Sequence, residues 1–344
     1  MIVRKWGIFA LIVTGSTGAA PLGAADAEQA IRQKLNISTS EKAELDQGKA
    51  IAREVKTKDG SEILVFGAIY VKGSPSVFLK TYTEVEKLVD GKGFLAAKKF
   101  QDPPVLSDLA NLTFDKEDLQ ALRTCSPGDC EVQLPADQME KFRKAIDWEA
   151  PQAEEQANAL ARQMALSGLQ IYLKGGNAAL GAYQDKSEPT HVETVFKTVL
   201  GRLTELPAYD REFYDYLLNY PRSKRPLNTS DFFYWETVKF GLKPTFRINH
   251  VIVRQPPDKP DRWIVANKQL YASHYFQTAL DMWLCIPATA SGKPGFYLLT
   301  VKGSRQDGLT GMKGSLLRRP VISRTLNSVR ASLERLKERT ETGR

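Results

Sequence analysis

The residues best suited to chemistry lie in the stretch ANKQLYASHYFQTALDMW, residues 266–283. Apolar positions alternate here with four polar-tipped side chains on a predicted strand: Lys268, Tyr271, His274 and Tyr275. Tyr and His combine an apolar body with one polar tip, a combination that orients amphipathic molecules in binding sites. We therefore take Tyr271, His274 and Tyr275 as candidate ligand-binding residues. Hydrogen bonding to neighbouring strands is the alternative role.

Strand geometry decides which of these side chains can act together. In a regular strand Tyr271 and Tyr275 face one side and His274 faces the other. A bulge that breaks the alternation would bring His274 and Tyr275 toward the same cavity. In that arrangement His274 would also be placed as a general base beside Tyr271 or Tyr275, which defines an enzyme alternative.

Two further candidates, Arg305 and Asp307, stand just before Gly308. Their opposite charges would allow an ion pair at the mouth of the fold, near a bound ligand. A solvated turn is the other interpretation. We include both residues in the candidate ligand-binding set.

Catalytic and metal-binding signatures are otherwise absent from the sequence. The three histidines, His191, His250 and His274, are scattered, and none forms H-E-x-x-H or another paired-ligand spacing. The sequence has no G-x-S-x-G elbow and no P-loop. We therefore predict no catalytic group, no cofactor and no metal. A zinc site that uses all three histidines is the open alternative.

Two of the three cysteines lie in CSPGDC, residues 125–130. Glu131 replaces the His of a haem attachment site, the spacing exceeds that of a thioredoxin motif, and no second ligand pair supports zinc. Pro127-Gly128 supplies a turn between Cys125 and Cys130, so we predict a small structural disulfide. Cys285 stands in an apolar run and is predicted to be a buried core thiol.

The N-terminal residues have the three-part pattern of a secretory signal peptide. Arg4 and Lys5 precede an apolar run and then small residues that end at Ala25 and Ala27. The run is shorter than the roughly 20 residues that span a bilayer, which disfavours an uncleaved anchor. We predict a signal peptide over 1–25 and an exported protein, periplasmic or extracellular, soluble after cleavage near Ala25.

Composition is that of a globular protein, with 42% hydrophobic and 26% charged residues in a chain of 344. The net charge is +8, and loss of Arg4 and Lys5 with the signal peptide would leave +6. Because an exported protein rarely meets nucleic acid, we predict no nucleic-acid partner. The basic residues gather near the C-terminus, so transient contact with an anionic membrane surface is one expectation. A solvated basic face is the other.

The first part of the chain predicts a hairpin followed by a helix. A polar segment over 26–48 comes first, and two β-rich runs then flank Lys58-Asp59-Gly60, a hairpin turn signal. The segment SPSVFLKTYTEVEKLVDG predicts a helix with Ser74 or Ser76 as its N-cap and Pro75 in its first turn.

Helical patterns dominate residues 101–231, and strands return from Phe232. Two alternating runs joined by a Pro-Asp-Lys-Pro-Asp loop predict a long hairpin, and ALDMWLCIPA and GFYLLTVKGS predict two more strands. The segment GLTGMKG, residues 308–314, predicts a flexible turn into a last helix over 316–341. The apolar positions of that helix recur at helical spacing: Ile322, Leu326, Val329, Leu333 and Leu336.

Strands grouped away from helices indicate an α+β fold with an antiparallel sheet. The segments GSPSVFLKTYTEVEKL and YLLTVKGSRQDGLTG, in this order with the long last helix, resemble the START-like helix-grip fold of polyketide cyclases and lipid-transfer domains. The resemblance covers residues 49–100 and 232–340 and makes the mainly helical 101–231 an insertion. The C-terminal half is also similar to an uncharacterised family of exported bacterial proteins.

The helix-grip resemblance implies a curved sheet that grips the C-terminal helix, with a ligand cavity between them. We therefore expect the protein to bind a hydrophobic or amphipathic, lipid-like small molecule there. The alternatives are an enzyme on the same scaffold with His274 as general base, and a protein-docking module that uses the insertion.

Overall fold

The computed structural model describes residues 37–90, 93–239, 243–290 and 292–343. Ser40–Arg344 form one structural unit, to which the description below applies. The predicted signal peptide, residues 1–25, lies outside the described residues, and so does the predicted polar segment 26–48 up to residue 36.

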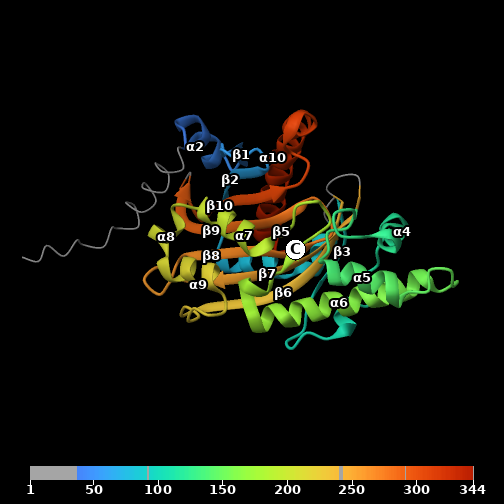
Figure 1. Cartoon of the computed structure of the whole chain (residues 1–344). Coiled ribbons are helices and arrows are strands. Elements are labelled where there is room, and N and C mark those ends of the chain that lie inside the picture. Colours follow the sequence, from blue (N-terminus) through green and yellow to red (C-terminus); the bar gives the residue numbers. More distant parts are fainter. Residues whose placement is uncertain (1–36, 91–92, 240–242, 291, 344) are drawn as a thin grey trace, which may run out of the picture. The chain divides into compact units, whose positions relative to one another are not determined.

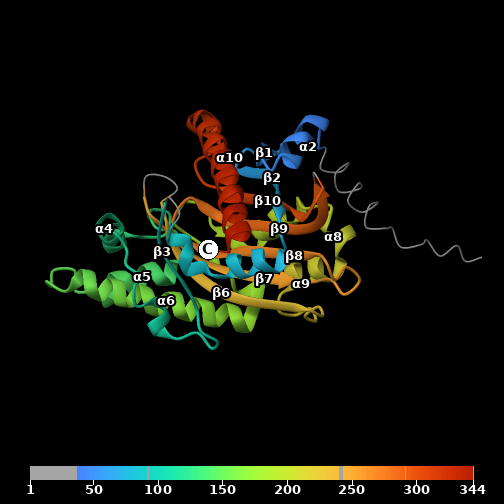
Figure 2. The ribbon, with the colours of Figure 1, turned by 180° about the vertical axis from the view of Figure 1, so that it is seen from behind.

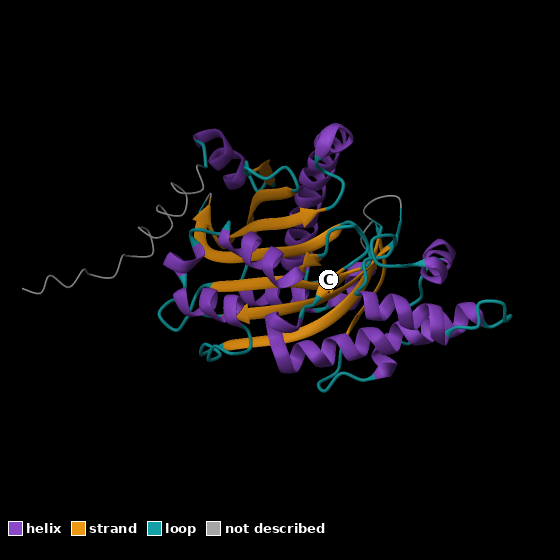
Figure 3. Ribbon diagram, in the orientation of Figure 1, coloured by secondary structure: helices purple, strands orange, loops and turns teal. Residues whose placement is uncertain are grey.

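An antiparallel sheet runs through this unit and confirms the predicted α+β class (Figure 1). Figure 3 shows that its strands curve across the unit. Among the described residues the sheet has eight strands, in the order β1-β2-β10-β9-β8-β7-β6-β3. Their bounds are β1 Ile51–Glu54, β2 Glu62–Lys72, β3 Phe94–Lys99, β6 Thr229–Val238, β7 Thr245–Arg254, β8 Trp263–Ala272, β9 Phe276–Ala290 and β10 Lys293–Gln306. A separate pair joins β4 (Ala182–Tyr183) to β5 (Thr190–His191).

Residues 101–231 are mainly helical, as predicted, and cover one face of the sheet (Figure 1). Their helices are α4 Lys116–Thr124, α5 Ala136–Ala145, α6 Ala153–Gly175, α7 Val192–Gly201, α8 Leu206–Tyr209 and α9 Arg211–Asn219, with short 3₁₀ helices at Leu106–Leu109 and Gly176–Ala179. One core cluster joins this block to the sheet and includes Leu169, Phe196, Phe213, Ile248, Ile264 and Leu280. The helical block is therefore part of the same unit as the sheet.

The opposite face carries α3 (Pro75–Thr83) and α10 (Gly311–Thr342), and α10 is the red helix of Figure 2. A 3₁₀ helix, Val85–Asp90, follows α3, and α2 (Thr39–Asp46) precedes β1. Ser74 caps α3 as predicted, because its hydroxyl accepts a hydrogen bond from the Ser76 N–H at 3.3 Å. Phe78 then packs on the sheet, with its ring centroid 6.2 Å from that of Trp283.

The apolar stripe predicted for the last helix is confirmed. Val329, Leu333 and Leu336 are buried in the core cluster on this face, and Ile322 and Leu326 are half-buried against it. At roughly 1.5–3 kcal/mol for each fully buried large side chain, this stripe holds α10 to the sheet.

Three basic side chains also fasten α10 to the strands β1 and β2. Arg318 donates to the Glu62 carbonyl at 2.8 Å, Arg330 to the Ala52 carbonyl at 2.8 Å and Lys337 to the Tyr70 carbonyl at 2.9 Å. Some of the basic side chains near the C-terminus thus form hydrogen bonds within the fold.

The prediction of a flexible turn over 308–314 is wrong in its second half, because α10 begins at Gly311. Gly308 and Gly311 both have positive φ, near 73°, and this conformation, which favours glycine, completes the turn before the helix. The predicted hairpins β1–β2 and β7–β8 and the strand pair β9–β10 are confirmed.

The predicted disulfide is confirmed, since Cys125 and Cys130 are bonded at the end of α4. Gly128, with φ of +87°, forms the turn between them. Cys285 is fully buried in β9, and burial raises the pKa of its thiol. It is the inert core cysteine that the sequence indicates.

Candidate ligand-binding site

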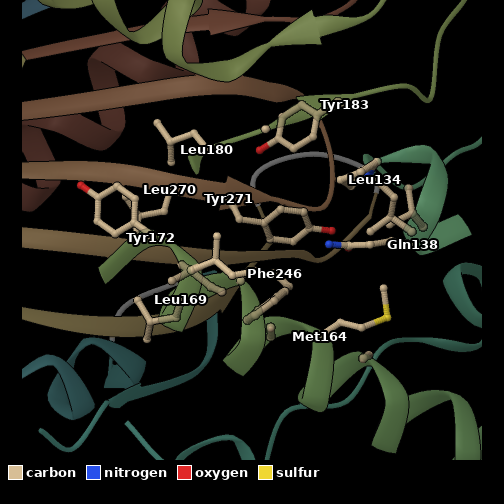
Figure 4. A pocket seen from close by; sticks show the side chains of 18 of the residues that line it. Leu134, Gln138, Met164, Leu169, Tyr172, Leu180, Tyr183, Phe246, Leu270 and Tyr271 are labelled. Carbon is tan, nitrogen blue, oxygen red and sulfur yellow. The ribbon is translucent and has the colours of Figure 1, made fainter. Parts of the chain in front are cut away.

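A cavity lies between the helical block and the sheet, and its floor is built by β7 and β8. Phe246 and Ile248 of β7 face the cavity, and so do Leu270 and Tyr271 of β8 (Figure 4). Successive residues of a regular strand point to opposite faces. Here the register passes from Ile248 paired with Tyr271 to Asn249 paired with Gln269, so Leu270 is an extra residue in β8. Because of this bulge, the side chains of Leu270 and Tyr271 both face the cavity.

The roof of the cavity is α6, which presents three small residues at helical spacing. Ala161, Ala165 and Gly168 leave space above the sheet, and the larger side chains of the same helix complete the roof: Met164, Leu169, Ile171 and Tyr172. The remaining wall comes from α4, α5, β4 and the segments that connect these elements: Phe114, Leu122, Val132, Leu134, Pro135, Gln138, Phe142, Ala179, Leu180, Gly181 and Tyr183. None of these lining residues belongs to α10, which lies on the opposite face of the sheet.

The cavity has a volume of about 180 Å³. Gly168 and Ile171 mark its opening, since Ile171 is 54% exposed and a β-carbon at residue 168 would meet no atom within 4 Å. The opening is therefore beside the C-terminal half of α6.

The wall is uncharged. Its polar groups are the Gln138 amide and the hydroxyls of Tyr172, Tyr183 and Tyr271. Burial raises the pKa of all three phenols, so they remain neutral at physiological pH. The Tyr183 hydroxyl accepts a hydrogen bond from the Ala272 N–H at 3.3 Å, which fixes its ring against the end of β8.

A buried polar chain holds Tyr172 from behind. The Tyr172 oxygen lies 3.1 Å from His250 Nδ1, and His250 Nε2 lies 3.3 Å from Asp231 Oδ2. Because a carboxylate only accepts, Nε2 carries the proton, Nδ1 accepts, and the Tyr172 hydroxyl donates to it. Lys268 Nζ in turn donates to the Tyr172 oxygen at 3.3 Å and to Asn177 Oδ1.

Burial lowers the pKa of both bases of this chain. Burial lowers the pKa of His250 to about 4. It also lowers the pKa of Lys268 well below its usual value, because the ammonium form would lose its hydration in the core. The chain therefore acts as a rigid support that positions the Tyr172 ring in the cavity wall.

Of the five residues proposed from the sequence, the structure places Tyr271 in the cavity wall. Figure 4 shows its ring between the strands and the helices. The other four lie around the turn that follows β8 and the end of β10. Arg305 pairs with Asp59 at 3.0 Å, and Asp307 Oδ1 accepts from Gln277 at 2.6 Å. The Tyr275 oxygen accepts from the Lys243 N–H at 3.0 Å.

His274 links this turn to the disulfide region. Its Nε2 lies 2.8 Å from Asp118 Oδ2, and its Nδ1 lies 3.0 Å from the Glu131 carbonyl oxygen. Both ring nitrogens thus lie within hydrogen-bond distance of groups of the fold itself, and neither faces the cavity wall. The surroundings of His274 thus favour a structural role.

Sequence reasoning missed most of the wall, including Tyr172, Tyr183 and Gln138. One signal was present: the residues Ala161, Ala165 and Gly168 form a run of small side chains on one face of a long helix. Such a face leaves room between a helix and its neighbour.

Comparisons with protein-family models, curated proteins and solved structures found no match. Within the described residues, no helix has the length and apolar character that crossing a bilayer requires. Nor do the described residues hold a group of three or more His, Cys, Asp or Glu side chains arranged to bind a metal.

Proposed function

We propose that this protein binds a small neutral apolar molecule, or the apolar end of an amphipathic one, in the cavity beneath α6. The observation that carries the proposal is the uncharged wall, in which three phenol hydroxyls and one amide interrupt an otherwise apolar surface. An ion entering such a site would lose its hydration without gaining a counter-charge. A neutral ligand with one hydroxyl or carbonyl group meets no such cost.

The volume limits the size of the ligand. The cavity, at about 180 Å³, resembles the roughly 150 Å³ apolar cavity that takes up benzene. It is smaller than the roughly 300 Å³ at which drug-sized pockets begin. A single ring or a short alkyl chain therefore fits, and the polar end of a longer amphiphile would remain at the opening near Gly168 and Ile171.

We further propose that the fold is of the START-like helix-grip type. The antiparallel sheet and the long α10 packed against it support this assignment. Sequence resemblance placed the ligand between the sheet and α10, whereas the cavity described above lies on the other face. The proposal accordingly moves the ligand to the side of the helical block.

The two alternatives have less support. An enzyme with His274 as general base would need a free ring nitrogen, and both are engaged. A docking module formed by residues 101–231 would need an uncovered apolar helix face. The apolar faces of this block instead contribute to the core against the sheet.

Export through a signal peptide is part of the proposal. The disulfide between Cys125 and Cys130 supports it, because such bonds persist in oxidising compartments and are rare in reducing ones. Mass spectrometry of the protein purified from fractionated cells tests this. We expect the exported fraction to contain a mature chain whose N-terminus lies near residue 26. An intact N-terminus in the cytoplasmic fraction would contradict export.

The binding proposal is tested by calorimetric titration with 1-hexanol and with hexanoate, which share a chain length and differ in charge. We expect saturable binding of hexanol and none of hexanoate. The variant Gly168→Phe places a ring at the opening and should weaken hexanol binding by about tenfold or more.

The matched control is Gly201→Phe, another helical glycine whose β-carbon would meet no atom within 4 Å and which lies outside the cavity wall. It should bind as the native protein does. Absence of hexanol binding, or equal loss in both variants, would refute the site.

A further inference from the structure

The first turns of α10 expose a group of large apolar side chains. Met312 is 87% exposed, Leu316 75% and Leu317 55%. Single exposed apolar residues are common on soluble proteins and need no explanation. Three within six residues of one helix, beyond the part of α10 that packs on the sheet, form a surface. This end of α10 is the upper end of the red helix in Figure 1.

Basic residues surround this group. Between Gly311 and Leu333 the helix has five basic residues and no acidic one. Arg318 and Arg330 are used within the fold. The other three, Lys313, Arg319 and Arg324, are exposed, and none makes an ion pair with another described residue.

Helical spacing arranges these residues on one side. At 3.6 residues per turn, Met312, Leu316 and Arg319 lie on one line along the helix. Lys313 and Arg324 lie together on the adjoining flank. Apolar side chains and cations thus share one exposed side of the helix, as in helices that lie at a lipid–water interface.

We propose that the first four turns of α10 dock on the surface of an anionic bilayer. Met312 and Leu316 would enter the boundary between head groups and acyl chains, while Lys313, Arg319 and Arg324 contact lipid phosphates. Charge favours this occupant over a second copy of the chain. A two-fold contact would place the surface against itself and bring like charges together. This inference is independent of the cavity beneath α6.

The test is co-sedimentation of the full-length protein with phosphatidylcholine vesicles, with and without phosphatidylglycerol. We expect binding to the anionic vesicles and a decrease as salt is added, because salt screens surface charge. Lys313→Glu with Arg319→Glu should weaken binding by about fivefold or more for each cation, the fold-change that corresponds to about 1 kcal/mol. Met312→Glu with Leu316→Glu should also weaken it.

Matched controls carry the same changes at other exposed positions. Leu227, 69% exposed, is changed to Glu, and Lys144, whose side chain is 75% exposed, is changed to Glu. Both control variants should bind anionic vesicles as the native chain does. Thermal unfolding should show that every variant folds. All variants share the N-terminal residues, so those residues contribute equally.

Three results would overturn the proposal. The first is no binding to anionic vesicles, and the second is equal binding by the α10 variants and the controls. The third is self-association of the native protein that Met312→Glu with Leu316→Glu abolishes, since that would assign the surface to a second copy.

Discussion

Leu270 and Tyr271 are neighbours in the chain, yet both side chains line one cavity, because β8 has one more residue than β7 at this position. Bulges of this kind re-aim side chains and are frequent beside functional sites. Without the extra residue, Tyr271 would point to the face of the sheet that carries α3 and α10. The bulge thus supplies one of the few polar groups in an apolar wall.

The contribution of Tyr271 can be divided between its ring and its hydroxyl. Tyr271→Phe keeps the ring and should leave stability within about 1 kcal/mol of native while weakening hexanol binding by roughly fivefold. Tyr271→Ala enlarges the cavity and should lower stability by about 3 kcal/mol. Calorimetric titration and urea unfolding measure the two effects. Equal hexanol affinity in Tyr271→Phe and native protein would remove the hydroxyl from the site.

Gly67 of β2 should be intolerant of a side chain. A β-carbon there would lie 2.6 Å from Val329 Cγ1 and 3.1 Å from Leu333 Cδ1. Gly67→Ala should therefore destabilise the fold by about 1–3 kcal/mol through overpacking against α10. In the double variant with Val329→Ala the clash is relieved, so the two effects should be less than additive. If the losses in unfolding free energy of the two single variants simply added up in the double variant, then α10 would have moved to accommodate the new methyl group.

The disulfide should be a modest stabiliser. It closes a loop of few residues, and so it removes little chain entropy from the unfolded state. Hydrogen bonds from Gly128 N–H to Gln184 O and from Cys130 N–H to Asp185 O hold the same loop. Changing Cys125 and Cys130 together to Ser should lower the free energy of unfolding by about 3 kcal/mol or less.

Thiol labelling provides the matching measurement. In folded native protein only Cys285 is a free thiol, and its burial should make it react slowly until the protein unfolds. Rapid labelling of three thiols without unfolding would contradict both the bond and the burial.

Much of the fold was predictable because its signals are local. Asp59-Gly60 marks the β1–β2 turn, Ser74 and Pro75 mark the start of α3, and periodic apolar residues mark the face of α10 that packs on the sheet. Each of these depends on neighbours within a few residues, so the sequence alone contains the information.

The cavity was much less predictable, because it depends on contacts between distant segments. Tyr172 meets His250 across 78 positions and Lys268 across 96. No periodic pattern reveals which face of the sheet the helical block will cover. The extra residue in β8 also leaves no trace in the alternation of residues 263–272, so only Tyr271 among the wall residues was identified.

The burial of His250 predicts a specific dependence of stability on pH. Its pKa is about 4 in the folded protein, against an ordinary value near 6.5. Between these values the unfolded chain binds more protons than the folded one, so stability rises with pH and is lost as pH falls from about 6.5 to about 4. Over this pH range His250 should lower the free energy of unfolding by about 3 kcal/mol.

Urea unfolding at a series of pH values between 7 and 4 would measure this effect. Carboxylates also titrate in this range, so the informative quantity is the difference between variants. His250→Gln can still donate to Asp231 and accept from Tyr172, but it does not titrate, and so its stability should fall less steeply on acidification. His191→Gln, at an exposed histidine of β5, should follow the native curve. If His250→Gln also followed the native curve, then His250 would be protonated within the fold and the chain that supports Tyr172 would carry a charge.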